Sequence, residues 1–165
     1  VKNFKKINFS SLNRLQMSAI KMELLKKINT IPISIILAQS IIESGWGASR
    51  FAQEGNALFG QWTWKNEDGI KPKGNLDANF SVKNFNSLLD SVNSYILNLN
   101  THPAYKELRN FRISQYKMSK NITGNDIANF LQNYAEIGFK YVVKVKEMIK
   151  NNKLSKFEDS KLIVY

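Results

Sequence analysis

The fold of this chain is decided by one stretch, Ile31-Pro-Ile-Ser-Ile-Ile-Leu-Ala-Gln-Ser-Ile-Ile-Glu-Ser-Gly-Trp-Gly47. Proline is favoured at the first position of a helix, so Pro32 predicts a helix start. The apolar residues that follow are spread around the helix rather than confined to one stripe, which predicts a helix buried on most sides. Gly45 can adopt the left-handed conformation that ends a helix. The chain is therefore expected to pack around one buried helix.

Glu43 is the one charged residue of this stretch and lies in the last turn of the predicted helix. A carboxylate there faces the negative end of the helix dipole, and its apolar surroundings remove part of its hydration. Both effects disfavour the ionised form and are expected to raise the pKa of Glu43. A carboxyl group that keeps its proton near neutral pH can act as a general acid. The alternative is a Glu43 that points into water or pairs with a lysine or arginine.

The composition fits one globular domain over residues 1–165, with 43% hydrophobic and 22% charged residues. The lack of cysteine excludes disulfides and a zinc–thiolate site. No run of about eighteen apolar residues is present, so no transmembrane segment is expected. No signal peptide is visible at Val1, and we do not read this as a cytoplasmic location.

The chain has a formal net charge of +11, which favours polyanionic partners such as nucleic acid, acidic lipid or an acidic wall polymer. Its lysines are scattered, however, as they are on a well-solvated basic surface. No base-reading motif is present, so we expect no nucleic-acid partner. His102 is the single histidine and precedes Pro103 in a predicted turn, where we expect a structural role. One histidine cannot make a metal site alone, so we predict no metal site.

The rest of the pattern predicts helices around a small β-lobe. Residues 60–82 combine an aromatic segment, two turn signals and a returning strand, which predicts a small antiparallel lobe. Apolar residues at helical spacing then return over residues 85–99 and 139–149. The expected fold is α+β and mostly helical, with a cleft between the lobes. Aromatic rings opposite a carboxylate suit a sugar polymer, because flat rings pack on the apolar faces of sugars.

Several aromatic and acidic residues have two possible roles. Trp62 and Trp64 alternate along a predicted strand and share one face, which is either core or a sugar platform. Trp46 is expected to pack beneath the end of the Glu43 helix. Tyr141 could lie in the core or in the cleft, and Glu136 is interpreted as a helix-start or surface carboxylate.

Three segments carry a family resemblance and follow one another in order: Ala38-Gln-Ser-Ile-Ile-Glu-Ser-Gly-Trp-Gly-Ala-Ser-Arg-Phe-Ala-Gln-Glu-Gly-Asn-Ala-Leu-Phe-Gly-Gln-Trp62, Asn98-Leu-Asn-Thr-His-Pro-Ala-Tyr-Lys-Glu-Leu-Arg109 and Tyr134-Ala-Glu-Ile-Gly-Phe-Lys-Tyr141. Together they closely resemble the Bax-type glucosaminidases of bacteria. That group belongs to glycoside hydrolase family seventy-three, with the flagellar peptidoglycan hydrolases.

The resemblance implies a lysozyme-like fold and cleavage of the β-1,4 bond after N-acetylglucosamine in peptidoglycan, without a cofactor. Glu43 matches the catalytic acid of the family. Tyr134 matches a tyrosine that lines the cleft, where its hydroxyl could orient water or the substrate N-acetyl group. Asn56, Phe59 and Gly60 match the Asn-x-Leu-Phe-Gly segment that shapes the cleft floor. The predicted substrate-binding set is completed by Trp62, Trp64 and Tyr141.

Hydrolysis also needs a base or nucleophile, about 5–5.5 Å from the acid for retention and about 6.5–9.5 Å for inversion. Enzymes of this family often carry a second acidic residue on the β-lobe. Our candidate is Asp77, which precedes the predicted returning strand but is not in clean register with the family pattern. Glu67 and Asp68 are alternatives in a predicted turn. The substrate N-acetyl group, or a water held by Tyr134, could also replace the second carboxylate.

The predicted partner is the glycan strand of peptidoglycan, met by a monomer in the periplasm or in the cell wall. Two other functions remain open. One is a lytic transglycosylase of similar fold, which uses Glu43 alone and releases an anhydro-sugar. The other is a non-catalytic wall-binding module, for which the charge of +11 is the main support.

Overall fold

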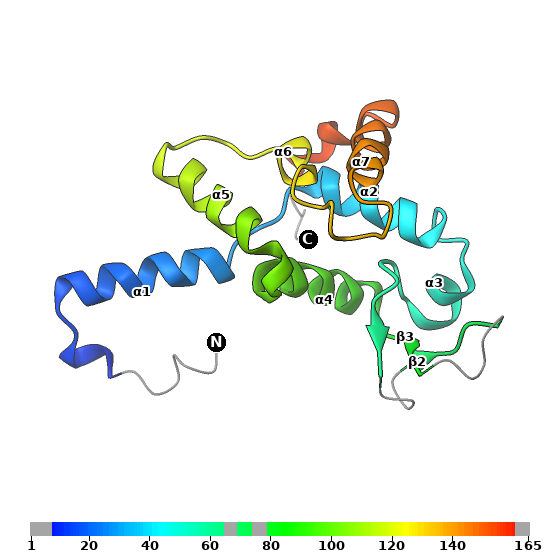
Figure 1. The fold of residues 1–165 in the computed structure, drawn as a ribbon, viewed down its shortest axis with the longest axis horizontal. Helices are drawn as coiled ribbons and strands as arrows, with labels where there is room; N and C mark the ends of the chain where they lie inside the picture. The colour runs from blue at the N-terminus through cyan, green and yellow to red at the C-terminus, as the bar shows by residue number, and fades with distance from the viewer. Residues whose placement is uncertain (1–7, 65–68, 74–78, 161–165) are drawn as a thin grey trace, which may run out of the picture.

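Figure 1 shows the protein as a computed structural model that describes residues 8–64, 69–73 and 79–160. Its α-helices are α1 (Arg14–Lys27), α2 (Ile33–Ser44), α3 (Arg50–Gly55), α4 (Leu88–Thr101), α5 (Lys106–Lys117), α6 (Gly124–Ala128) and α7 (Phe139–Asn151). The short 3-10 helices are η2 (Phe9–Ser11), η4 (Pro103–Tyr105) and η5 (Leu154–Phe157). The predicted α+β, mostly helical fold is confirmed.

The β-lobe is a small antiparallel sheet of β1 (Trp62–Thr63), β2 (Gly69–Ile70) and β3 (Ser81–Lys83) in the order β1-β3-β2. Val82 of the central strand pairs with a residue on each side, Trp62 and Ile70. A Cβ atom on Gly69 would lie 2.5 Å from the Cβ of Ser81, so this close approach requires glycine. The lobe therefore forms where the sequence predicts it.

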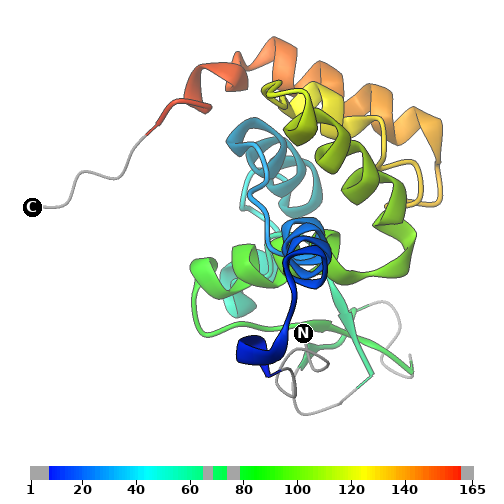
Figure 2. The same cartoon turned by 90° about the vertical axis from the view of Figure 1, so that its left-hand side faces the viewer.

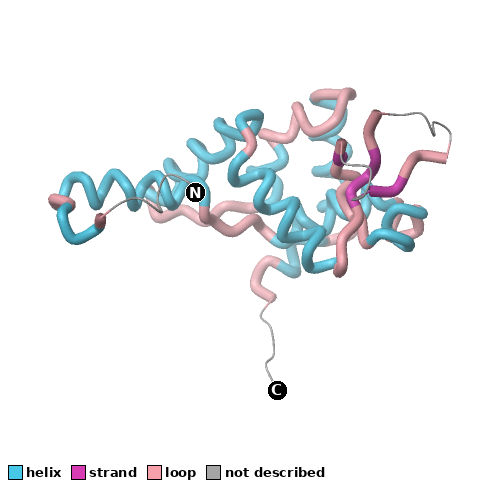
Figure 3. Tube along the Cα trace, turned by 90° about the horizontal axis from the view of Figure 1, so that it is seen from below, coloured by secondary structure: helices cyan, strands magenta, loops and turns pink. Residues whose placement is uncertain are grey.

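The sheet and α1 lie at opposite ends of the long axis of the molecule (Figures 1 and 3). In Figure 2, which looks along α1, α2 lies between the sheet below and α7 above. Within the described residues, no helix is both long and apolar enough to cross a membrane. The arrangement leaves the last turn of α2 next to the β-lobe.

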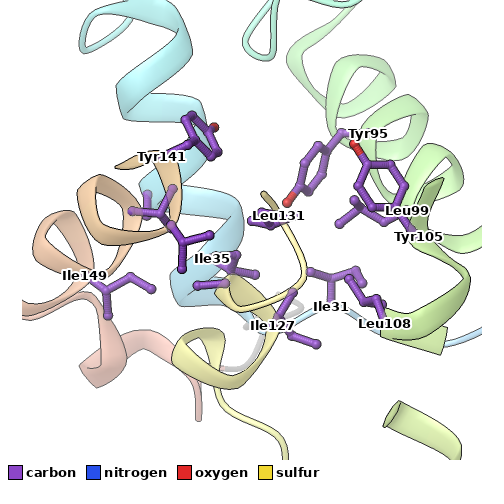
Figure 4. Packing of buried hydrophobic residues seen from close by; sticks show 14 of the residues in the cluster. Ile31, Ile35, Tyr95, Leu99, Tyr105, Leu108, Ile127, Leu131, Tyr141 and Ile149 are labelled. Atoms are coloured by element: carbon purple, nitrogen blue, oxygen red, sulfur yellow. The ribbon is translucent and has the colours of Figure 1, made fainter. Parts of the chain in front are cut away.

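The core is built around α2, as predicted. None of the residues of α2 is exposed. α2 packs against α6, α7 and η5. Ile35 and Ala38 of α2 are fully buried. Figure 4 shows the side chains that converge here; they include Ile31, Tyr95, Leu99, Leu108, Ile127, Leu131, Tyr141 and Ile149. Their burial fixes the position and tilt of the helix that carries Glu43.

The N-terminal end of α2 is held by a distant residue. Pro32 is the N-cap, so α2 begins at Ile33, one residue later than predicted, and the proline side chain makes no capping hydrogen bond. Glu158 caps the helix instead: its Oε2 accepts a hydrogen bond from the Ile33 N–H at 2.9 Å, and its Oε1 accepts one from the Ser34 hydroxyl. A carboxylate at a helix N-terminus is favoured by the helix dipole. The segment after α7 thus stabilises the start of α2.

Candidate active site

A cleft of about 440 Å³ opens at the last turn of α2. It is lined from both lobes and from the segment before α7 by Glu43, Phe59, Gly60, Gln61, Trp62, Asn98, Tyr105, Tyr134, Ala135 and Glu136. Five residues predicted from the sequence therefore meet here: Glu43, Phe59, Gly60, Trp62 and Tyr134. The lining combines two carboxyl groups with aromatic rings and amides, which is the mixture that a sugar-binding cleft requires.

The last turn of α2 is fixed by its own backbone and by Ser44. Gly45 adopts the left-handed conformation, with φ +57°, and ends the helix as predicted. The Ser44 hydroxyl donates to the Ser40 carbonyl at 2.6 Å and accepts from the Gly47 N–H at 2.7 Å. Glu43 therefore projects from a rigid helix end.

Glu43 is partly buried, and burial raises its pKa as the sequence predicts. A hydrogen bond from Tyr141 and the positive charge of Lys144 act in the opposite direction, but burial has the larger effect on the pKa. Across residues 8–64, 69–73 and 79–160, the salt bridges involve Glu23 and Glu54, and none reaches Glu43. Glu43 is thus a cleft carboxyl group whose pKa lies above its usual value because it is partly buried.

Behind Glu43 lies a run of buried polar groups. The Tyr141 hydroxyl donates to Glu43 Oε1 at 2.5 Å and accepts from Gln39 Nε2 at 2.9 Å. The Tyr95 hydroxyl donates to Gln39 Oε1. Gln39 and Tyr95 are fully buried, and Tyr141 is 2% exposed. Tyr141 therefore supports Glu43 from within the core and is not part of the cleft lining.

An aromatic cluster forms the floor of the cleft. The rings of Phe59 and Tyr95 stack at 4.2 Å, and those of Tyr134 and Tyr141 stack at 5.4 Å. The Tyr134 hydroxyl donates to the Phe59 carbonyl at 3.2 Å, which joins the segment before α7 to the segment before β1. Burial raises the pKa of Tyr134 far above its usual value, so its hydroxyl keeps its proton.

The loop that enters the β-lobe turns at two positions of positive φ. Asn56 has φ +52°, ends α3 and donates from its side chain to the Phe85 carbonyl at 2.9 Å. Gly60 has φ +58°, which glycine adopts without strain. Asn56 therefore shapes the loop without lining the cleft, whereas Gly60 lies in the lining.

The three tryptophans are all exposed. Trp46 was predicted to pack beneath the helix end, and this prediction is wrong: Trp46 lies in the helix-ending turn with φ +61° and is 66% exposed. β1 ends at Thr63, so Trp62 and Trp64 do not alternate within one strand. Trp62 stacks on Phe80 at 4.2 Å and lines the cleft, while Trp64 is 73% exposed outside the lining. Neither belongs to the core.

The candidates for the second carboxylate, Asp77, Glu67 and Asp68, lie outside the described residues. Among the described residues, Glu136 is the acidic side chain that lines the cleft together with Glu43, and the sequence analysis missed it. Gln61, Asn98 and Tyr105 were missed in the same way, because nothing local marks them as cleft residues. No group of three or more histidine, cysteine or acidic residues in the described part of the chain could hold a metal ion.

The comparisons with known proteins agree with this fold and cleft. Residues 19–154 match the glucosaminidase family, described as mannosyl-glycoprotein endo-beta-N-acetylglucosaminidase, a class of glycosidases. The chain belongs to this glucosaminidase family. It is also 34% identical over 118 residues to Protein bax of Escherichia coli strain K12, which confirms the resemblance to Bax-type glucosaminidases. That match covers 72% of this chain but 42% of the relative, so the chain spans less than half the length of the relative.

Proposed function

We propose that this chain is a peptidoglycan hydrolase of the endo-β-N-acetylglucosaminidase type, which cleaves the β-1,4 bond after N-acetylglucosamine. The observation that carries the proposal is Glu43, a carboxyl group of raised pKa that lines a cleft and forms no salt bridge among the described residues. The Tyr141 bond occupies its Oε1, and no described residue bonds to its Oε2. In this mechanism Glu43 donates its proton to the glycosidic oxygen as the leaving sugar departs.

The substrate is proposed to lie across the β-lobe and the helical body. Trp62 is 56% exposed and offers a flat face to a sugar ring, and Phe59, Gly60 and Tyr134 form the floor. Asn56 supports that floor through its bond to the Phe85 carbonyl. Trp64 is proposed as a second, outer sugar platform. With such a substrate, the proposed location is the periplasm or the cell wall.

The second catalytic group is proposed to be Asp77, with Glu136 as the described alternative in the cleft. Asp77→Asn and Glu136→Gln distinguish the two, since loss of the true base is expected to reduce cleavage by about 10²–10⁴-fold. If both variants keep full activity, the substrate N-acetyl group or a water held by Tyr134 takes this role.

The test of the proposed function is digestion of purified peptidoglycan, followed by mass spectrometry of the released fragments. Reducing N-acetylglucosamine ends are expected. Anhydro-muramic ends would identify a lytic transglycosylase, and reducing N-acetylmuramic ends would identify a muramidase. Binding to peptidoglycan without any release would identify a wall-binding module and overturn the proposal.

A further inference from the structure

The polar groups behind Glu43 form one continuous hydrogen-bonded chain across three helices. Tyr95 belongs to α4, Gln39 to α2 and Tyr141 to α7. Figure 4 shows Tyr95 and Tyr141 within the buried cluster, and the two hydroxyls meet the two ends of the Gln39 side-chain amide. This series of hydrogen bonds ends at Glu43 Oε1, which accepts from Tyr141. A fully buried glutamine is costly unless both ends of its amide are hydrogen-bonded, and here both are.

Tyr95, at the buried end of this series of hydrogen bonds, determines which group donates and which accepts in each bond. Tyr95 is fully buried, and its hydroxyl has no acceptor other than Gln39 Oε1 among the described residues. Gln39 must therefore present its oxygen to Tyr95 and its NH₂ group to Tyr141. The Tyr141 oxygen then accepts from Gln39, and its single proton is left for Glu43. A rotated Gln39 amide would instead attract the Tyr141 proton and leave Glu43 without this donor.

We propose that Gln39 and Tyr95 are positioning residues for Glu43, acting through Tyr141: they keep the Tyr141 hydroxyl pointed at Oε1 and so reserve Oε2 for proton transfer to the substrate. This inference rests on the proposed function, because it assigns a purpose to the orientation of the Glu43 carboxyl group. Neither Gln39 nor Tyr95 lines the cleft, so they do not touch the substrate. Tyr95 also stacks on Phe59 of the cleft floor, so one residue supports both the acid and the floor.

Other charged and titratable groups also lie near Glu43 and could affect its pKa. Lys144 on α7 lowers its pKa through its charge, and the Tyr141 bond lowers it as well. The titratable groups that share the cleft with Glu43 are Tyr105, Tyr134 and Glu136. Burial raises the pKa of Tyr105 to about 12 and raises the pKa of Tyr134 well above its usual value, so both hydroxyls stay neutral near neutral pH. A change in the titration of Glu43 after a substitution at position 95 would therefore come through Gln39 and Tyr141.

The test compares the pH–kcat profiles of Tyr95→Phe, Tyr141→Phe and the double variant, each made in the whole chain. Loss of the Tyr141 donor raises the pKa of Glu43, so the basic limb of the pH–kcat profile, where the acid loses its proton, moves to higher pH. Tyr141→Phe is expected to show the full shift, with kcat lowered about three- to tenfold. Tyr95→Phe is expected to show the same direction of shift with KM unchanged. The double variant is expected to match Tyr141→Phe alone, because both changes act on one bond.

Gly124→Ala is the matched control, because it disturbs the far end of α2 and leaves the hydrogen-bonded chain intact. It is expected to lower the melting temperature without moving the pH profile. A Tyr95→Phe variant that loses stability but keeps the wild-type pH profile would reduce Tyr95 to a structural role and overturn the proposal. If Tyr95→Phe does not fold, Gln39→Met replaces it, since it removes both amide bonds at similar side-chain length.

A second measurement keeps this proposal separate from the proposed function. The Glu43 side-chain carboxyl carbon can be titrated by NMR in wild-type protein and in Tyr95→Phe without any substrate. An upward shift of the Glu43 pKa in the variant supports the positioning chain even if no glycan is cleaved. An unchanged Glu43 titration in Tyr95→Phe, next to a shifted one in Tyr141→Phe, would refute it while leaving the hydrolase proposal untouched.

Discussion

A carboxylate lies at each end of helix α2, and the surroundings of the two have opposite effects on the ionised form. At the N-terminus, Glu158 faces the positive end of the helix dipole and accepts hydrogen bonds on both oxygens. At the C-terminus, Glu43 faces the negative end, is partly buried and accepts one described hydrogen bond, from Tyr141. The first arrangement stabilises a charge, and the second disfavours it. One helix therefore separates a structural carboxylate from a candidate catalytic one.

The largest expected effect is on the C-terminal end of α2. Glu43→Gln removes the proposed general acid, so cleavage of peptidoglycan is expected to fall by about 10²–10⁴-fold. Stability is expected to hold or rise, because a disfavoured charge is removed. Glu147→Gln, which changes an exposed carboxylate of α7, is the control and should keep full activity. Full activity in a well-folded Glu43→Gln protein would show that the two ends do not differ in function.

The next effect concerns packing at the N-terminal end of α2. A Cβ atom on Gly124 would lie 2.1 Å from Ser34 Oγ and 3.0 Å from the Ile35 backbone nitrogen, so Gly124→Ala forces α6 away from α2. The free energy of unfolding is expected to fall by about 1–3 kcal/mol, measured by urea denaturation. kcat at 25 °C should stay close to that of the wild type. A stable Gly124→Ala protein would mean that α6 can move from α2 without cost.

A smaller loss is expected when the favourable carboxylate is removed. Glu158→Ala eliminates the acceptor for the Ile33 N–H and the Ser34 hydroxyl, which should cost about 1–2 kcal/mol of unfolding free energy. Glu158→Gln keeps an acceptor and loses the charge, so it should cost less. Thermal denaturation followed by circular dichroism measures both. Equal losses in the two variants would assign the whole effect to the charge.

The smallest effect is the pH dependence of stability. Burial raises the folded-state pKa of Glu43 above its unfolded value, so the folded protein binds this proton more tightly than the unfolded chain does. Its contribution to stability is complete below the unfolded pKa and is lost as pH rises through the folded pKa. The difference in melting temperature between Glu43→Gln and wild type should therefore grow in favour of the variant from about pH 4 to about pH 7. A difference that shrinks with rising pH would mean that the folded protein favours ionised Glu43.

Local sequence patterns predicted the elements that depend on near neighbours. The apolar run and Gly45 were sufficient to predict α2 and its end, and the turn signals predicted the β-lobe. The burial of Glu43 followed from its place in that helix. Gln39 also had a usable signal that was overlooked: it lies one turn before Glu43 on the same helix and is polar within an apolar run.

Contacts between distant segments could not be predicted in this way. Glu158 caps a helix that begins 125 positions earlier, and nothing near Glu158 in the sequence indicates that partner. Arg112 is 1% exposed and donates to the Lys26 carbonyl and to Asn100, although a lone arginine is normally expected at the surface. Trp46 was predicted to pack beneath the end of α2, but it has a positive φ in the turn after that helix and is exposed.

The exposure of Trp46, Trp62 and Trp64, at 66%, 56% and 73%, has a practical consequence for spectroscopy. These are the three tryptophans of the chain, and more than half of the surface of each is already exposed to water in the folded protein. Their fluorescence should change little on denaturation, so it is a poor reporter of unfolding. The same emission should respond when a sugar ring covers Trp62, which makes the native protein its own optical sensor of glycan binding.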